Sequence, residues 1–154
     1  MPERVNGFSL VEVLIATSVL AAVLVGVGHV SAMATRANHL ARLSTQSAAL
    51  AAGKMEELRA VPSMNLQPSP TGALSSNQAG YFDVIDATGR VLDESAWTPL
   101  NRAYVRRWAV TSIDSSLRVL EVLASPWPEV GETGDPSRPA GATYLVSVRG
   151  SRGE

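Results

Sequence analysis

The stretch FSLVEVLIATSVLAAVLVGVGHVSAMA, residues 8–34, decides the fold of this chain. It holds 27 residues and a single charged side chain, that of Glu12. An α-helix rises about 1.5 Å per residue, so a helix over this stretch is about 40 Å long. That length exceeds the roughly 30 Å hydrocarbon core of a bilayer, and a helix that is apolar on every side belongs inside a large core or a membrane. The stretch therefore predicts a membrane-spanning helix.

The helix is expected to continue past Ala34 in amphipathic form. Over residues 35–61, apolar side chains return with the period of a helix and polar side chains fall on the opposite side. The apolar stripe is made of Leu40, Leu43, Leu50, Ala51, Met55, Leu58 and Val61, and Ser47 and Lys54 interrupt it. Pro62 disfavours helical geometry in the residue before it, so the helix is predicted to run from Phe8 to Val61.

Beyond Pro62 the pattern changes to loops and short strands. Proline and glycine residues predict loops over residues 62–80 and 125–142. Apolar and polar side chains that alternate with a period of two predict five strands, at residues 81–85, 90–92, 104–113, 117–124 and 143–149. These strands are expected to form a small antiparallel sheet with one apolar face that needs a cover. The stripe of the helix supplies that cover, so the predicted fold class is α+β.

The composition excludes several kinds of protein. The chain has 154 residues, 13 Lys and Arg against 14 Asp and Glu, and no cysteine. A net charge of −1 argues against binding to nucleic acid, which needs an excess of basic side chains. Without cysteine there is no disulfide, no thiol nucleophile and no cysteine-ligated metal.

The residues around the start of the apolar stretch are specific. Gly7-Phe8-Ser9-Leu10-Val11-Glu12-Val13-Leu14-Ile15-Ala16 resembles the processing signal of type IV pilins and type II secretion pseudopilins. The resemblance implies that residues 1–7 are a leader, that a prepilin peptidase cuts between Gly7 and Phe8, and that the new amino terminus is methylated. It implies a long helix packed on a sheet, as in the pilin fold.

The resemblance extends more weakly into the predicted sheet. The strands at 104–110 and 117–124 look like those of minor pilins of the V type and of the I-type pseudopilin. Two features depart from the family pattern, because Asn6 stands where a basic residue is common and no disulfide can close the carboxy-terminal loop. The implied organisation is a leader at 1–7, a transmembrane and assembly half at 8–34, an amphipathic half at 35–61 and a globular domain at 62–154.

Glu12 has two interpretations. A carboxylate in a membrane helix costs up to about 3 kcal/mol on insertion scales. A partner amine, such as the processed amino terminus of a neighbouring subunit, offsets that cost and helps to set the assembly register in the family. Alternatively, Glu12 lies among lipid headgroups, where an acidic side chain is favourable at a helix amino terminus. The motif favours the first interpretation.

The remaining candidates predict no catalytic, cofactor or metal site. Gly26-Val27-Gly28 lies inside the apolar helix rather than after a strand, so it is no dinucleotide fingerprint. His29 and His39 are too few to hold zinc. Arg106 is expected to share a strand face with Tyr104 and Trp108, in a cation–π contact or an ion pair rather than as a nucleic-acid platform.

Together these features predict a structural protein and not an enzyme. It would be a minor pilin or pseudopilin, held in the bacterial inner membrane with its globular domain in the periplasm and then built into a filament. The expected partners are other pilin subunits, the prepilin peptidase and membrane lipid. The alternatives are a type II secretion component, a competence pilin, or a signal-anchored binding module or enzyme. The Lys and Arg count opposes the predicted orientation, since Arg4 precedes the span and both Arg36 and Arg42 follow it.

Overall fold

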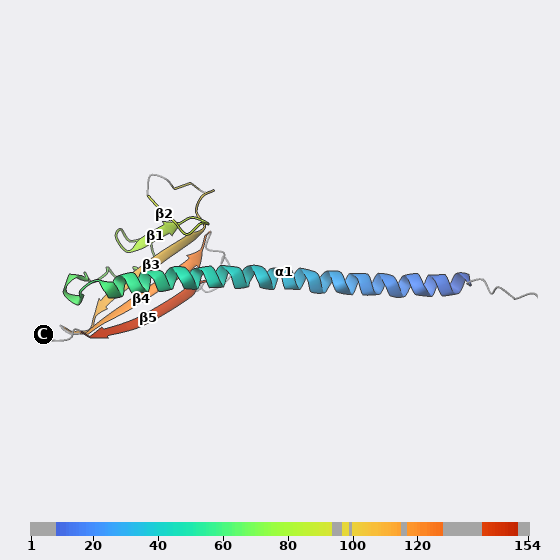
Figure 1. Ribbon diagram of the computed structural model, residues 1–154, viewed down its shortest axis with the longest axis horizontal. Coiled ribbons are helices and arrows are strands. Elements are labelled where there is room, and N and C mark those ends of the chain that lie inside the picture. Colours follow the sequence, from blue (N-terminus) through green and yellow to red (C-terminus); the bar gives the residue numbers. More distant parts are fainter. Residues whose placement is uncertain (1–8, 94–96, 99, 115–116, 128–139, 151–154) are drawn as a thin grey trace, which may run out of the picture. The chain divides into compact units, whose positions relative to one another are not determined.

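The computed structural model describes residues 9–93, 97–98, 100–114, 117–127 and 140–150 (Figure 1). The chain divides into two compact units, Met1–His39 and Leu40–Glu154, and each is described by itself. Helix α1, Leu10–Ala60, runs through both without interruption. It stops just before the predicted end at Val61, and a short 3-10 helix, η1 (Ser63–Asn65), lies in the predicted loop.

The second unit holds one antiparallel sheet covered by the second half of α1 (Figure 1). The strands are β1 (Phe82–Ile85), β2 (Val91–Leu92), β3 (Tyr104–Ser112), β4 (Leu117–Pro126) and β5 (Thr143–Gly150). Their order across the sheet is β2-β1-β3-β4-β5, and every neighbouring pair is antiparallel. The predicted α+β class and all five strands are confirmed, with boundaries shifted by one or two residues.

The turn between β1 and β2 forms for a local reason. The Oδ1 atom of Asp86 accepts hydrogen bonds from the backbone N–H and hydroxyl of Thr88 and from the backbone N–H of Arg90. These bonds, that from the Thr88 hydroxyl above all, hold the pKa of the Asp86 carboxyl below its ordinary value. Gly89 has φ +88°, a conformation that favours glycine.

The core lies between α1 and the helix-facing side of β3 and β4. Its buried side chains from the helix are those of Ala51, Met55 and Leu58, and those from the sheet are Trp108, Val110, Leu120, Val122 and Ala124. The strand residues alternate, because successive side chains of a strand point to opposite faces. The helix therefore covers one face of the sheet at its centre.

The predicted apolar stripe of α1 is partly wrong. Leu40 is 48% exposed, and Leu43 and Leu50 are only partly buried. Ser47 and Lys54, the two polar residues that interrupt the stripe, are buried. The small side chains of Ser47 and Ala51 let the helix approach the sheet closely, so the contact line is narrower than the apolar pattern suggests.

Lys54 is buried because its charge has partners. Its Nζ atom lies 2.8 Å from Oε1 of Glu57 and 3.8 Å from the ring centroid of Trp108. The methylene stem of a lysine covers apolar surface while the ammonium keeps polar contacts, so such a residue fits beside an apolar core. The cation over Trp108 is therefore Lys54, not Arg106.

Leu120→Ala is expected to lower the free energy of unfolding by about 2–5 kcal/mol, because a fully buried leucine leaves a cavity when truncated. The side chain of Leu120 is 0% exposed. Denaturant unfolding of the full chain in detergent, followed by tryptophan fluorescence, measures the change. Val148→Ala is the control, since Val148 is 62% exposed and truncation there is expected to cost about 0.5 kcal/mol or less. Equal losses in the two variants would contradict the placement of the core.

Candidate functional site

Glu12 lies in the first turn of α1 and is exposed. The backbone carbonyl of Ser9 accepts hydrogen bonds from the N–H groups of Glu12 and Val13, at 3.0 and 3.2 Å. The other two predicted site residues, Gly7 and Phe8, lie outside the described residues. The carboxylate of Glu12 thus stands at the positive end of the helix dipole, where an acidic group is stabilised. It borders a shallow hollow lined by Val13, Ala16, Thr17 and Leu20.

The helix surface after Glu12 is apolar, and none of the described residues of its own unit covers it. Its exposed large apolar residues include Leu14, Ile15, Val19, Leu20, Val23, Leu24, Val27, Val30 and Met33. Among the residues that the structure describes, α1 is the one helix long and apolar enough to cross a membrane. The most hydrophobic part of this helix has no residue buried. Removing so much apolar surface from water is favourable, so lipid or other protein must cover it.

The few hydroxyl groups of this segment are satisfied inside the helix. Thr17, Ser18 and Thr35 donate to backbone carbonyls three or four residues earlier, at 3.0, 2.8 and 2.9 Å. A polar group without a hydrogen bond is costly in an apolar environment, and these bonds remove that cost. Glu12 is therefore the one polar side chain from Leu10 to Ser18 that still needs an external partner.

The two glycines of the segment are not required by the chain itself. A Cβ atom added to Gly26 or Gly28 would meet nothing within 4 Å. Small residues on a membrane helix let another helix approach closely, and the sequence offers Ala22 with Gly26 and Gly28 with Ala32. His29 and His39 are exposed on the same helix. Among the described residues no group of three or more potential ligands could hold a metal ion.

The aromatic and basic residues of β3 have a structural role. Arg106 forms an ion pair with Asp83 on β1, at 2.5 Å, and is 8% exposed. Its Nη1 atom also donates to the backbone carbonyl of Leu50 on α1, at 3.1 Å. Arg107 points to the other face and donates to Asn77 at 2.9 Å. The prediction of an ion pair for Arg106 is confirmed, and its guanidinium is committed to the fold.

Tyr104 makes another polar contact between β3 and α1. Its hydroxyl donates to the side-chain amide oxygen of Gln46, and burial raises the pKa of this hydroxyl. Gln46, Leu50 and Lys54 are spaced by four on the helix, and they meet Tyr104, Arg106 and Trp108, which are spaced by two on the strand. The spacing of two on β3 indicates that Tyr104, Arg106 and Trp108 share a face, but it does not indicate which residues of α1 lie opposite them.

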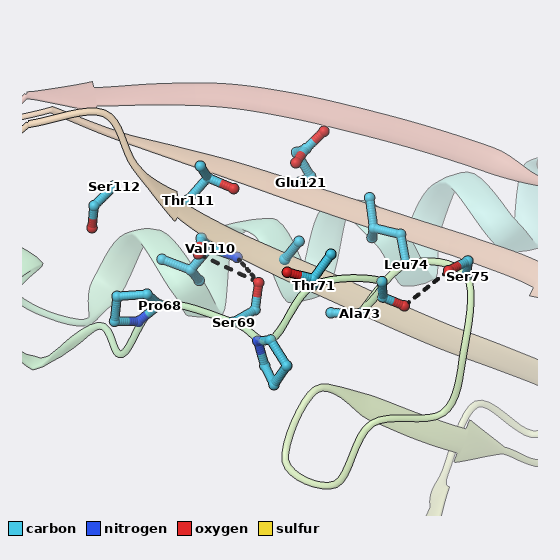
Figure 2. A pocket seen from close by; sticks show the side chains of 13 residues that line it. Pro68, Ser69, Thr71, Ala73, Leu74, Ser75, Val110, Thr111, Ser112 and Glu121 are labelled. Atoms are coloured by element: carbon cyan, nitrogen blue, oxygen red, sulfur yellow. Dashed lines mark hydrogen bonds between the residues drawn. The ribbon is translucent and has the colours of Figure 1, made fainter.

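A second hollow lies on the sheet. It lies between residues 68–75 and β3, with Glu121 of β4 at its border (Figure 2). Figure 2 shows the hydroxyl of Ser69 bonded to the backbone of Val110 and that of Ser75 bonded to the loop itself. The carboxylate of Glu121 accepts a hydrogen bond from Tyr144. The residues that line this hollow include no histidine, lysine or arginine.

One comparison with known proteins identifies the amino-terminal segment. Residues 4–28 match the model of the prokaryotic N-terminal methylation motif, the signature of type IV pilins and pseudopilins. The matched residues span Gly7, Phe8 and Glu12 and most of the exposed apolar surface of α1. Comparison with curated proteins and with solved structures gives no match.

Proposed function

We propose that this chain, which carries the prepilin-type methylation motif, is a minor pilin or pseudopilin that is built into a type IV pilus-like filament. The observation that carries the proposal is the position of the motif. The motif, residues 4–28, includes the start of a helix whose large apolar side chains are exposed among the described residues. A motif of this kind points to a structural subunit rather than an enzyme.

The motif implies processing by a prepilin peptidase and assembly with other pilin subunits. In our proposal residues 1–7 are the leader, Gly7 is its last residue, and Phe8 begins the mature chain. Residues 8–34 serve as membrane anchor and then as assembly surface, and residues 35–61 attach the globular domain, 62–154. The carboxylate of Glu12 binds the amino terminus of a neighbouring subunit.

The proposed location follows from the same segment. Motif and apolar helix together support membrane anchoring. We place the globular domain in the periplasm, although Arg36 and Arg42 after the span oppose this orientation by the positive-inside rule. We give the motif more weight than these two side chains.

Fractionation of filaments tests the proposal. The full chain, tagged at its carboxyl end, is produced in its native host, and surface filaments are sheared off and separated from membranes. We expect the tagged chain in the filament fraction, at low abundance relative to the main subunit. An unrelated single-pass protein of the same membrane is the control for contamination. A chain confined to the membrane fraction, while filaments are made normally, would contradict the proposal.

A further inference from the structure

The second half of α1 and strand β5 run in the same direction. At one end the Thr143 hydroxyl lies 3.5 Å from the carbonyl oxygen of Ser44. Further along, the guanidinium of Arg59 donates to the Ser147 hydroxyl at 2.8 Å. Figure 1 shows β5 beside this part of α1. A force that pulls the start of this helical half away from the end of β5 therefore acts along the contact between them.

Two arginines attach the sheet to the main chain of the helix. Arg149 of β5 donates from one nitrogen, Nη1, to the carbonyls of Arg59 and Val61, both at 2.6 Å. Arg106 of β3 donates to the carbonyl of Leu50 at 3.1 Å, and its ion pair with Asp83 fixes it to β1. The last carbonyls of a helix have no partner within it, and a cation is favourable there. Hydrogen bonds from charged donors are about twice as strong as neutral ones.

We propose that Arg106 and Arg149 form a mechanical clamp, which resists sliding of α1 along the sheet when the helix is pulled along its axis. The proposal rests on the proposed function only for the origin of the pull. A subunit held in a filament through its apolar helix receives tension through α1. Because α1 and β5 run in the same direction, this tension loads both arginine attachments and the apolar core together, rather than one after another.

Force spectroscopy on single molecules tests the clamp, and the absence of cysteine makes attachment points free to choose. In the full chain in detergent, Ala41→Cys with Gly150→Cys gives a pull along the contact. A Cβ at Gly150 would meet nothing within 4 Å. Ala41→Cys with Ala142→Cys places both attachment points at the same end of the contact between α1 and β5. A pull between them separates the helix from the strand one contact after another. At equal force we expect a longer lifetime for the first pair of attachment points. Equal lifetimes, or a longer one for the second pair, would overturn the proposal.

Arg149→Gln is expected to shorten the lifetime along the contact about tenfold or more, because bonds from a charged donor to two carbonyls are lost. The matched control is Arg118→Gln. Arg118 pairs with Arg149 across β4 and β5, but donates to the carbonyl of Leu66, outside α1, at 2.8 Å. The control should change the lifetime much less. An unchanged lifetime in Arg149→Gln, or equal shortening by both variants, would overturn the clamp.

Arg106 needs a paired variant, since its loss alone leaves the partly buried carboxylate of Asp83 without this cation. Asp83→Asn with Arg106→Gln removes both charges. We expect a shorter lifetime along the contact and little change in the peeling geometry, whereas a loss of general stability would shorten both equally and refute the role of Arg106. These experiments use isolated chains, so a negative result for the clamp does not contradict the proposed incorporation into filaments. Conversely, the clamp can still be measured if the chain is found never to enter filaments.

Discussion

Gly7→Val is expected to leave the chain uncut in cells that process the wild-type protein. In the family a prepilin peptidase cuts after this glycine, and a branched side chain crowds a site that accepts a residue with none. Intact-mass spectrometry of the membrane-extracted protein measures the result. The wild type should begin at Phe8 and carry one methyl group, whereas the variant should retain residues 1–7 without methylation.

Asn6→Ala is the matched control, because it changes the neighbouring leader residue while keeping the glycine. It should be cut like the wild type. Processing of Gly7→Val at the same position would contradict the assignment of the cleavage site. A wild-type protein that itself retains residues 1–7 would contradict the pilin proposal as a whole.

An uncut chain is also expected to be excluded from filaments. The leader carries Glu3 and Arg4 and would remain joined to the apolar helix. The α-amino group would then stand at Met1, seven residues away from the position where Glu12 of a neighbour needs it. The same fractionation that tests the proposed function reports this loss, with membrane abundance as the reference.

The long helix and the strands could be predicted because their signals are local. A continuous apolar run, a proline after Val61 and a period of two in the later segments each act within a few residues. The Asp86 to Gly89 turn is of the same kind, since its hydrogen bonds stay within the turn. Such elements need no knowledge of what they pack against.

The contact line of the helix could not be predicted from the same pattern. Periodicity finds apolar residues, but Leu40 is half exposed while Ser47 and Lys54 are buried. Which residues of an amphipathic helix touch the sheet depends on the size of side chains and on partners elsewhere in the chain. Lys54 is tolerated because Trp108 and Glu57 meet its charge, and these lie on two different elements.

The contact between Arg149 and the end of α1 could not be predicted from the sequence either. Arg149 is the last residue of the strand predicted at residues 143–149. The sequence did not reveal that the last carbonyls of α1 lie there, since that depends on the order β2-β1-β3-β4-β5. The candidate site at Gly7, Phe8 and Glu12, by contrast, came from a motif read in one short stretch.

Glu12→Ala is expected to leave membrane insertion and folding of residues 62–154 intact, but to reduce incorporation into filaments strongly. Insertion should improve slightly, because the variant removes a group that costs up to about 3 kcal/mol in a membrane helix. Sheared filaments and membranes from the same cells give the two abundances to compare. Glu12→Asp keeps the charge and should retain part of the incorporation.

The reason lies in what each kind of interaction can specify. Burial of the apolar surface from Leu14 to Met33 drives association, but it is non-directional and leaves the axial offset between neighbouring helices free. A single charge in a neutral segment removes that freedom, because one offset brings it to a partner amine, as a buried polar residue sets register in a coiled coil.

A double variant separates the position of the carboxylate from its mere presence. Glu12→Ala with Val13→Glu keeps the net charge and the insertion cost, but turns the carboxylate about 100° around the helix. If Glu12 pairs with a neighbouring subunit, this variant should fail to restore incorporation. Full restoration would mean that any carboxylate in the headgroup layer suffices, because lipid does not distinguish two positions on the circumference of one helix. Loss of Glu12→Ala from the membrane as well would instead assign Glu12 to processing or stability.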